Sequence, residues 1–251
     1  MTKELTKNNT FNLVYKREYV DSDNQQYDDY FPIYYTIFRN VPIKFLNKLN
    51  NKDLKKRIKD FCDKNDCRYI GAEFNLGTKN KSLKLHNFYV PAGGDEPDIN
   101  VNPKFKHKLD FLDEMHHHLK DQVIDKQYHI IVGDMNIAPH VNDVWSHKQL
   151  INVVSHTDIE RSKISEIINT QKFCDVLRHF ANEGEKVYSW WSYRNRDWKK
   201  SNRGRRLDHI WITDNLLKYY MEHNIFQMAR DFERPSDHVP ISATFQLGSI
   251  T

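Results

Sequence analysis

Short strand-like segments that alternate with helical segments constrain the fold of this chain more than any other feature. Runs rich in aromatic and β-branched residues predict strands at 68–75, 84–90, 128–133, 207–213 and 239–247. Apolar residues at every third or fourth position predict amphipathic helices over 103–120 and at about 160–180. Because strand faces and helix stripes must be buried against one another, this alternation indicates a layered α/β domain.

Length and composition suit a domain of this kind. The chain has 251 residues, of which 39% are hydrophobic, and 14 Phe, 13 Tyr and 5 Trp supply bulky side chains for a core. It contains no run of about 18 apolar residues, so we expect no membrane span. Three cysteines cannot build a disulfide framework, and the start MTKELTKNNT lacks the apolar stretch of a secretory signal. We therefore expect a soluble, cytoplasmic protein, and we expect it to be a monomer.

Some segments give weak or bland signals. Residues 1–10 are polar, and residues 46–66 are rich in Lys, Asn and Asp, which suits either a surface helix or a loop. His116, His117 and His118 stand in the predicted helix over 103–120. Because consecutive helical residues point to different sides, the pattern favours a solvated face over a metal site.

The segment IIVGDMNIAP, residues 130–139, carries the first candidate catalytic side chains. An apolar strand runs into Gly133, and Asp134 and Asn136 follow at its carboxyl end. In an extended backbone, residues two apart share one face, so a carboxylate and an amide point together beyond the strand tip. A carboxylate can accept a proton or bind a metal, and an amide can donate to a phosphate oxygen. The alternative is an ordinary capped turn, because Asp and Asn are common turn residues.

Further candidates stand beside two other predicted strands. Asp237 and His238 open the strand at 239–247, where the pair suits acid–base chemistry, a metal site or merely a surface turn. Asp208 lies at the start of the strand at 207–213. A buried carboxylate there could hold the imidazole of His238 in one tautomer, as the acid of a catalytic triad does.

The segment 188–206, YSWWSYRNRDWKKSNRGRR, points to a partner. It contains seven Lys and Arg residues against the single acid Asp197, interleaved with five aromatic residues. Cations neutralise phosphates and release counterions, while aromatic rings stack on bases and sugars. The alternative is a charged surface loop with a few core aromatics. The composition favours a nucleic-acid partner.

Taken together, GDMNIAP, YSWWSYR, NRGRRLDHIWIT and RPSDHVPI resemble the exonuclease III family, the abasic-site endonucleases of the endonuclease/exonuclease/phosphatase superfamily. NFYVPAGG at 87–94 and RYIGAEF at 68–74 match two further strands, so the resemblance covers about residues 68–247. It implies an α/β fold, a four-layer sandwich of two packed mixed β-sheets flanked by helices. We expect this domain over 34–251, after a divergent amino-terminal segment at 1–33 from which the family's amino-terminal strands are missing.

The resemblance implies metal-dependent hydrolysis of a DNA phosphodiester. Asp134 matches the residue that orients or deprotonates the attacking water, and Asn136 and Tyr89 match groups that hold the scissile phosphate. His238 matches the histidine that stabilises charge on the phosphoryl oxygens, with Asp208 as its partner.

The same resemblance implies a metal and a substrate pocket. Asp237 matches a carboxylate near the metal, where Asp134 and Asn136 are further candidate ligands, and Mg²⁺ (or Mn²⁺) suits this chemistry. Residues expected to contact double-stranded DNA with an abasic site, the first two by lining a pocket for the flipped-out sugar, are Trp190, Leu207, Asn202 and Arg203. An abasic nucleotide costs least to extrude because its pairing and stacking are already lost.

The amino-terminal part departs from the family. The family's second strand ends in a Gln-Glu pair whose glutamate is the principal metal ligand, and no Gln-Glu dipeptide stands before residue 68. TFNLVYK at 10–16 resembles the first motif only through Asn12. Arg205 stands where some family members have an aromatic residue. We interpret the amino-terminal part of the chain as degenerate, truncated or rearranged relative to the family.

Three functions follow as hypotheses. The leading one is a DNA-repair hydrolase that cuts 5′ to abasic sites and acts as a 3′→5′ exonuclease on duplex DNA. The second is a catalytically weakened or inactive DNA-binding homologue that lost the metal glutamate. The third keeps the fold but acts on a phosphoinositide or sphingolipid headgroup, which the basic, aromatic segment at 188–206 disfavours.

Overall fold

The computed structural model describes residues 10–17, 34–39, 68–75, 82–122, 127–195, 197–233 and 235–246. The strands are β1 (Thr10–Arg17), β2 (Tyr34–Arg39), β3 (Tyr69–Asn75), β4 (Ser82–Tyr89), β5 (Tyr128–Asp134), β6 (Phe173–Asp175), β7 (Trp190–Trp191), β8 (Gly204–Arg205), β9 (Asp208–Thr213), β10 (Tyr220–Ile225) and β11 (Ile241–Gln246). The helices are α3 (Pro103–Gln122), α4 (His147–Leu150), α5 (Asp158–Thr170), α6 (Val176–His179) and α7 (Trp198–Ser201), with 3-10 turns η1 (Val141–Asp143), η2 (Asp214–Tyr219) and η3 (Gln227–Asp231).

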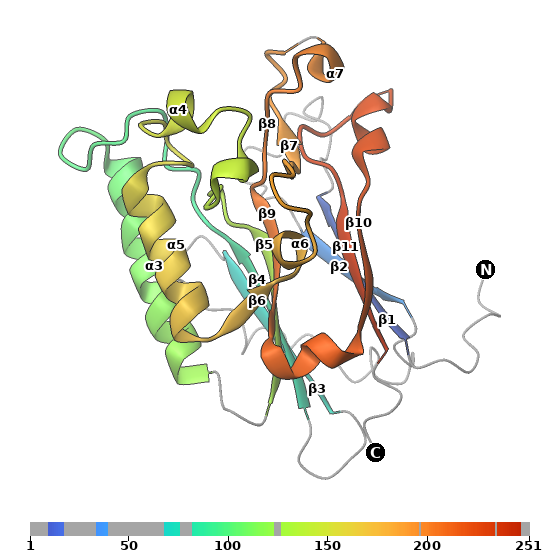
Figure 1. The fold of residues 1–251 in the computed structure, drawn as a ribbon. Coiled ribbons are helices and arrows are strands. Elements are labelled where there is room, and N and C mark those ends of the chain that lie inside the picture. The colour runs from blue at the N-terminus through green and yellow to red at the C-terminus, as the bar shows by residue number, and fades with distance from the viewer. Residues whose placement is uncertain are drawn as a thin grey trace, which may run out of the picture.

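Two sheets form the centre of the molecule (Figure 1). One has the order β3-β4-β5-β9-β6, in which only β4 and β5 run parallel, and the other has the order β10-β11-β1-β2, with antiparallel pairs throughout. The short strands β7 and β8 pair separately. The predicted class, two packed sheets with flanking helices, is confirmed, although only the five-stranded sheet is mixed.

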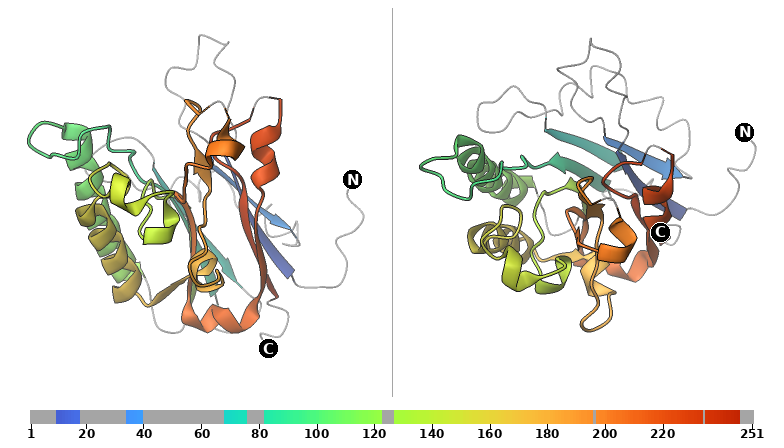
Figure 2. Two further views of the ribbon diagram at one scale, coloured as in Figure 1. Left: turned by 45° about the horizontal axis from the view of Figure 1, so that its top comes forward. Right: turned by 90° about the horizontal axis from the view of Figure 1, so that it is seen from above.

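The layers are held together by two apolar clusters. Strand alternation sends one set of side chains, including Ile130 and Ile212, between the two sheets, where they meet Ile241 and Phe245 of β11. The opposite face of the five-stranded sheet packs against α3 and α5, which lie side by side over it (Figure 2). Within the described residues, no helix is long and apolar enough to cross a membrane.

The predicted elements are largely confirmed. All five predicted strands form, as β3, β4, β5, β9 and β11, and the helix predicted over 103–120 is α3. The helix predicted at about 160–180 is wrong in its second half, because α5 ends at Thr170 and the chain continues as β6 and α6. The apolar spacing there serves an edge strand that pairs with β9 and then a single helical turn. The segment 46–66 and residues 1–9 lie outside the described residues.

The three adjacent histidines of α3 differ from the predicted solvated face. His117 is exposed, but His118 is half-buried and its ring meets Tyr69 edge-on at 4.8 Å. A helical side chain at this position faces the sheet because α3 lies flat on it. Within the described residues, these histidines are not part of a cluster that could hold a metal.

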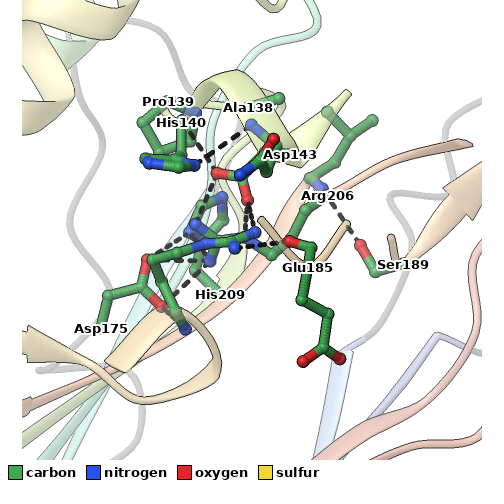
Figure 3. A network of polar contacts seen from close by, with 12 residues as sticks. Ala138, Pro139, His140, Asp143, Asp175, Glu185, Ser189, Arg206 and His209 are labelled. Carbon is green, nitrogen blue, oxygen red and sulfur yellow. Dashed lines mark hydrogen bonds and ion pairs between the residues drawn. The ribbon is translucent and has the colours of Figure 1, made fainter. Parts of the chain in front are cut away.

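A buried ion network fixes the approach to β9 (Figure 3). The guanidinium of Arg206 donates to both carboxylate oxygens of Asp143 in η1, at 2.9 and 2.7 Å, and to Asp175 at the end of β6. Burial alone would raise the pKa of the Asp143 carboxyl, but Arg206 and Arg178 outweigh burial and hold that pKa below its usual value. The network therefore anchors the residues just before Asp208.

Candidate active site

A tight turn at the end of β5 presents Asp134 and Asn136. Gly133 has φ of +139°, and a Cβ there would meet the carbonyl oxygen of Phe88 at 1.8 Å, so only glycine fits. Asn136 has φ of +51°, its backbone N–H donates to Oδ1 of Asp134, and its Nδ2 donates to Oδ2 of Asp134 and to the carbonyl oxygen of Val90. The two side chains meet as predicted, and they do so through a capped turn. Because both Nδ2 hydrogens have acceptors, Asn136 offers its Oδ1 to other partners.

Asp208 and His238 form a buried contact beneath the turn. Nδ1 of His238 lies 2.7 Å from Oδ2 of Asp208, which also accepts a hydrogen bond from the hydroxyl of Ser189 at 2.7 Å. Nε2 of His238 faces Oδ2 of Asp134 at 3.8 Å, beyond hydrogen-bond distance. Asp208 thus holds the imidazole by one nitrogen, as predicted, and leaves the other facing Asp134.

Asp237 is the third acidic side chain of the candidate site. Its Oδ2 accepts a hydrogen bond from Nε1 of Trp190 at 2.9 Å, and its backbone carbonyl accepts one from the N–H of Trp191. The bridge between Trp190 and His238 fixes this register. Oδ1 of Asp237 is buried and has no hydrogen-bond partner among the described residues.

These side chains open into a cavity of about 730 Å³. Of the predicted site residues, those that line it are Tyr89, Asp134, Asn136, Trp190, Arg203, Leu207, Asp237 and His238. Asp208 lies behind His238, fully buried. Asn202 is the exception: it does not line the cavity and instead accepts a hydrogen bond from Nε1 of Trp191 at 3.1 Å. Its predicted contact with substrate stays a prediction.

The donor atoms fit a hard divalent cation. Asp134 and Asp237 supply carboxylate oxygens and Asn136 an amide oxygen, the atoms that Mg²⁺ prefers. The unpartnered, buried Oδ1 of Asp237 is the observation that favours a ligand at this wall, because such an atom is costly unless a cation or donor satisfies it. Asp134, Asp208 and His238 also bring ligand atoms within 4.8 Å of one another. Nδ1 of His238 is already engaged by Asp208, so that trio suits proton chemistry better than metal binding.

Sequence reasoning missed the residues that support the turn from behind. Lys108 of α3 is fully buried, donates to the carbonyl oxygen of Asn136 at 2.8 Å and pairs with Glu160 of α5. Burial lowers the pKa of the Lys108 ammonium, and the Glu160 carboxylate opposes this only in part. A signal was present, since Lys108 follows Phe105 by three positions on the apolar stripe of its helix. Ser189 gave no comparable signal.

Comparisons with known proteins show which family the chain resembles in sequence and fold. The sequence model of the Endonuclease/Exonuclease/phosphatase family matches residues 17–238. The chain is 28% identical over 203 residues to an exodeoxyribonuclease III of Haemophilus influenzae, covering 78% of this chain and 69% of the relative. It is 30% identical over 112 residues to an exodeoxyribonuclease of Bacillus subtilis, covering 45% of this chain and 42% of that relative.

Solved structures share the fold. An AP endonuclease from Archaeoglobus fulgidus superposes with a TM-score of 0.66 at 28% identity, over 76% of this chain and 70% of that one. A 3′ phosphatase from Neisseria bound to a product DNA hairpin gives a TM-score of 0.64 at 24% identity, over 73% and 66%, a likeness of fold alone. The resemblance to the exonuclease III family is confirmed by these relatives. With a family match that spans most of its length, the chain belongs to the endonuclease/exonuclease/phosphatase family.

Proposed function

We propose that this chain is a metal-dependent DNA phosphodiesterase of the exonuclease III type, which cuts 5′ to abasic sites and removes nucleotides from 3′ ends of duplex DNA. The observation that carries the proposal is the convergence of Asp134, His238 and Asp237 at one cavity, backed by the Asp208–His238 contact of 2.7 Å. The similarity to an exodeoxyribonuclease III and to an AP endonuclease supports the substrate class.

The residues divide the chemistry of hydrolysis among them. Asp134 takes the proton of the attacking water or orients it, because its carboxylate is held by Asn136 and faces the cavity. His238 donates from Nε2 to a phosphoryl oxygen, while Asp208 fixes its tautomer and stabilises the positive charge. Tyr89, whose ring lies 4.6 Å from the Arg68 guanidinium, contacts the same phosphate from the end of β4.

The metal in this proposal is Mg²⁺, held by Asp134, Asp237 and Oδ1 of Asn136. When bound, it neutralises charge on the phosphate and lowers the cost of attack. The acids that line the cavity among the described residues are Asp95, Asp134 and Asp237, with no glutamate. A site with fewer carboxylates binds the cation less tightly. The second candidate function is therefore a DNA-binding homologue with weakened or absent cleavage.

DNA recognition falls to the basic, aromatic segment. Arg194, Arg203 and Arg205 line the cavity, and the Arg203 guanidinium stacks on Trp145 at 4.7 Å. Trp190 and Leu207 form an apolar wall that suits a sugar without a base. We also propose that the protein acts as a cytoplasmic monomer, and that residues 34–251 form the catalytic domain, to which the divergent segment at 1–33 contributes β1 between β11 and β2.

Substrate competition tests the proposal. Incision is measured in Mg²⁺ on a duplex with one abasic site, on the undamaged duplex and on a soluble inositol polyphosphate. The proposal predicts cutting of the abasic strand at least about 10²-fold faster than release of phosphate from the inositol compound. Turnover of the inositol phosphate without cutting of DNA would overturn it. Salt-sensitive binding of abasic DNA without any incision would favour the inactive homologue.

A further inference from the structure

Arg205 is a cation in the cavity wall that has no carboxylate of its own. Its Nη1 donates to the carbonyl oxygen of Val154 at 3.1 Å and to the hydroxyl of Ser155 at 2.6 Å. Among the described residues, no carboxylate forms an ion pair with it, and Nε and Nη2 find no acceptor. The carboxylate whose charge acts on it, that of Glu160, is already paired with Lys108.

A half-buried guanidinium without a carboxylate partner costs free energy, because burial disfavours its charge. Burial lowers the pKa of Arg205, and Glu160 opposes that effect without a direct contact. The neighbouring residue Arg206, by contrast, is neutralised by Asp143 and Asp175. The hydrogen bonds of Nη1 fix the side chain in place, so the remaining N–H groups are pre-oriented for an anion.

The position of Arg205 shows where that anion would lie. Its guanidinium stands 5.4 Å from the ring centre of Trp190, and Nε1 of the same indole donates to Asp237. The Trp190 indole therefore lies between the Asp237 carboxylate and the Arg205 guanidinium, and both of these groups line the same cavity. A sugar whose 5′ phosphate is held at Asp134 and His238 would lie against Trp190 and Leu207, with its 3′ side toward Arg205.

We propose that Arg205 is a specificity-determining residue whose guanidinium binds the phosphate on the 3′ side of the sugar in the cavity. The inference rests on the proposed function and deepens it. It makes the cavity select an abasic sugar that carries a second phosphate over one that ends in a 3′-hydroxyl. An apolar or aromatic wall at this place would accept both ends, because it has no charge to satisfy.

The test compares two duplexes that differ by one phosphate. In each, one strand ends in a tetrahydrofuran abasic analogue, with either a 3′-phosphate or a 3′-hydroxyl, and binding is measured by fluorescence anisotropy in EDTA. A charge-assisted hydrogen bond predicts that the wild-type chain binds the phosphorylated end at least about tenfold more tightly. Arg205→Gln should reduce that ratio to about one or two, because it weakens the complex with the phosphorylated end more than the complex with the hydroxyl end, and Arg205→Lys should retain part of the ratio.

The control is Lys199→Gln. Lys199 lies on α7, pairs with Asp231 and does not line the cavity, so this change should weaken both complexes alike and leave the ratio intact. A ratio of about one in the wild type, or an undiminished ratio in Arg205→Gln, would overturn the role of Arg205. The wild-type ratio decides even if the variant folds poorly. Equal binding of abasic and undamaged duplexes would instead contradict the proposed function, and the role of Arg205 with it.

Discussion

At the scale of single residues, the proposed hydrolysis depends on how Asp208 holds His238. The contact between Nδ1 and Oδ2 is 2.7 Å long and fully buried, and Ser189 supports the same oxygen. A carboxylate stabilises an imidazolium, whereas a neutral amide does not.

Asp208→Asn should therefore lower the single-turnover rate of incision by about 10²-fold while DNA affinity stays within about twofold. Gel-based incision and anisotropy on the same preparation measure both quantities. Ser189→Ala is the matched control, with a smaller loss, because it keeps the Asp208–His238 contact and removes the hydroxyl that donates to Asp208 and accepts from the N–H groups of Leu207 and Asp208. A wild-type rate in Asp208→Asn would exclude the proposed role of this pair.

The sequence predicts the residues of the site better than their surroundings. Asp134, Asp208 and His238 lie at strand ends, and strand ends can be read from apolar runs followed by polar residues. The left-handed backbone of Asn136 and the buried ammonium of Lys108 behind it depend on how α3 lies on the sheet. The place of Lys108 on the apolar stripe of α3 indicates burial, but no local pattern shows that its ammonium reaches the carbonyl oxygen of Asn136.

At the scale of elements, α3 offers a matched pair of lysines. Lys108 and Glu160 join α3 to α5 with both side chains fully buried, whereas Lys106 and Asp110 pair on the exposed face of α3. Lys108→Met should lower the free energy of unfolding by about 3–5 kcal/mol, because Glu160 keeps a buried charge without its partner.

Urea denaturation checks this value, and Lys106→Met should cost no more than about 1 kcal/mol. Equal losses in the two variants would show that burial of the Lys108 pair contributes nothing special to the α3–α5 contact.

Strands β4 and β5 contain a buried histidine pair that makes stability depend on pH. Nε2 of His86 lies 3.0 Å from Nδ1 of His129. Burial lowers the pKa of His86 well below its usual value and that of His129 to about 4. The unfolded chain binds protons on both below about pH 6.5, whereas in the folded chain His129 does not bind one until about pH 4 and His86 binds one only well below its usual pKa.

The free energy of unfolding should therefore fall as the pH drops from about 6.5 toward 4, by up to about 1.4 kcal/mol per pH unit for each histidine. Urea midpoints at pH 7.5 and pH 5 measure the loss. His129→Gln should reduce the slope, and His117→Gln, on the exposed face of α3, should not. An unchanged slope in His129→Gln would contradict this assignment.

The helix predicted at about 160–180 shows where element prediction fails. Its second half, from Phe173, becomes β6, which pairs with β9 through Cys174 and Ile212. The apolar spacing satisfies a helix and an edge strand followed by a helical turn equally well, and only pairing with a distant strand decides between them.

At the scale of the whole molecule, charge is distributed to suit a polyanion. The chain carries a net charge of +4, and Arg194 and Arg203 line the same cavity as the acidic side chains of the site. The logarithm of the binding constant for duplex DNA should fall linearly with the logarithm of salt concentration. Arg194→Gln should make this slope shallower by about one. Titrations at several salt concentrations measure it. A slope near zero would rule out phosphate contacts as the basis of binding.

The measurement that tests the central claim is incision of an abasic duplex by the purified chain with and without Mg²⁺, beside an Asp134→Asn control. We expect cutting that requires the metal and is lost in Asp134→Asn, because in the proposed mechanism the carboxylate at the end of β5 serves both the water and the cation. Cutting that persists in EDTA or in Asp134→Asn would contradict it, since neither result is possible if this cavity performs the chemistry.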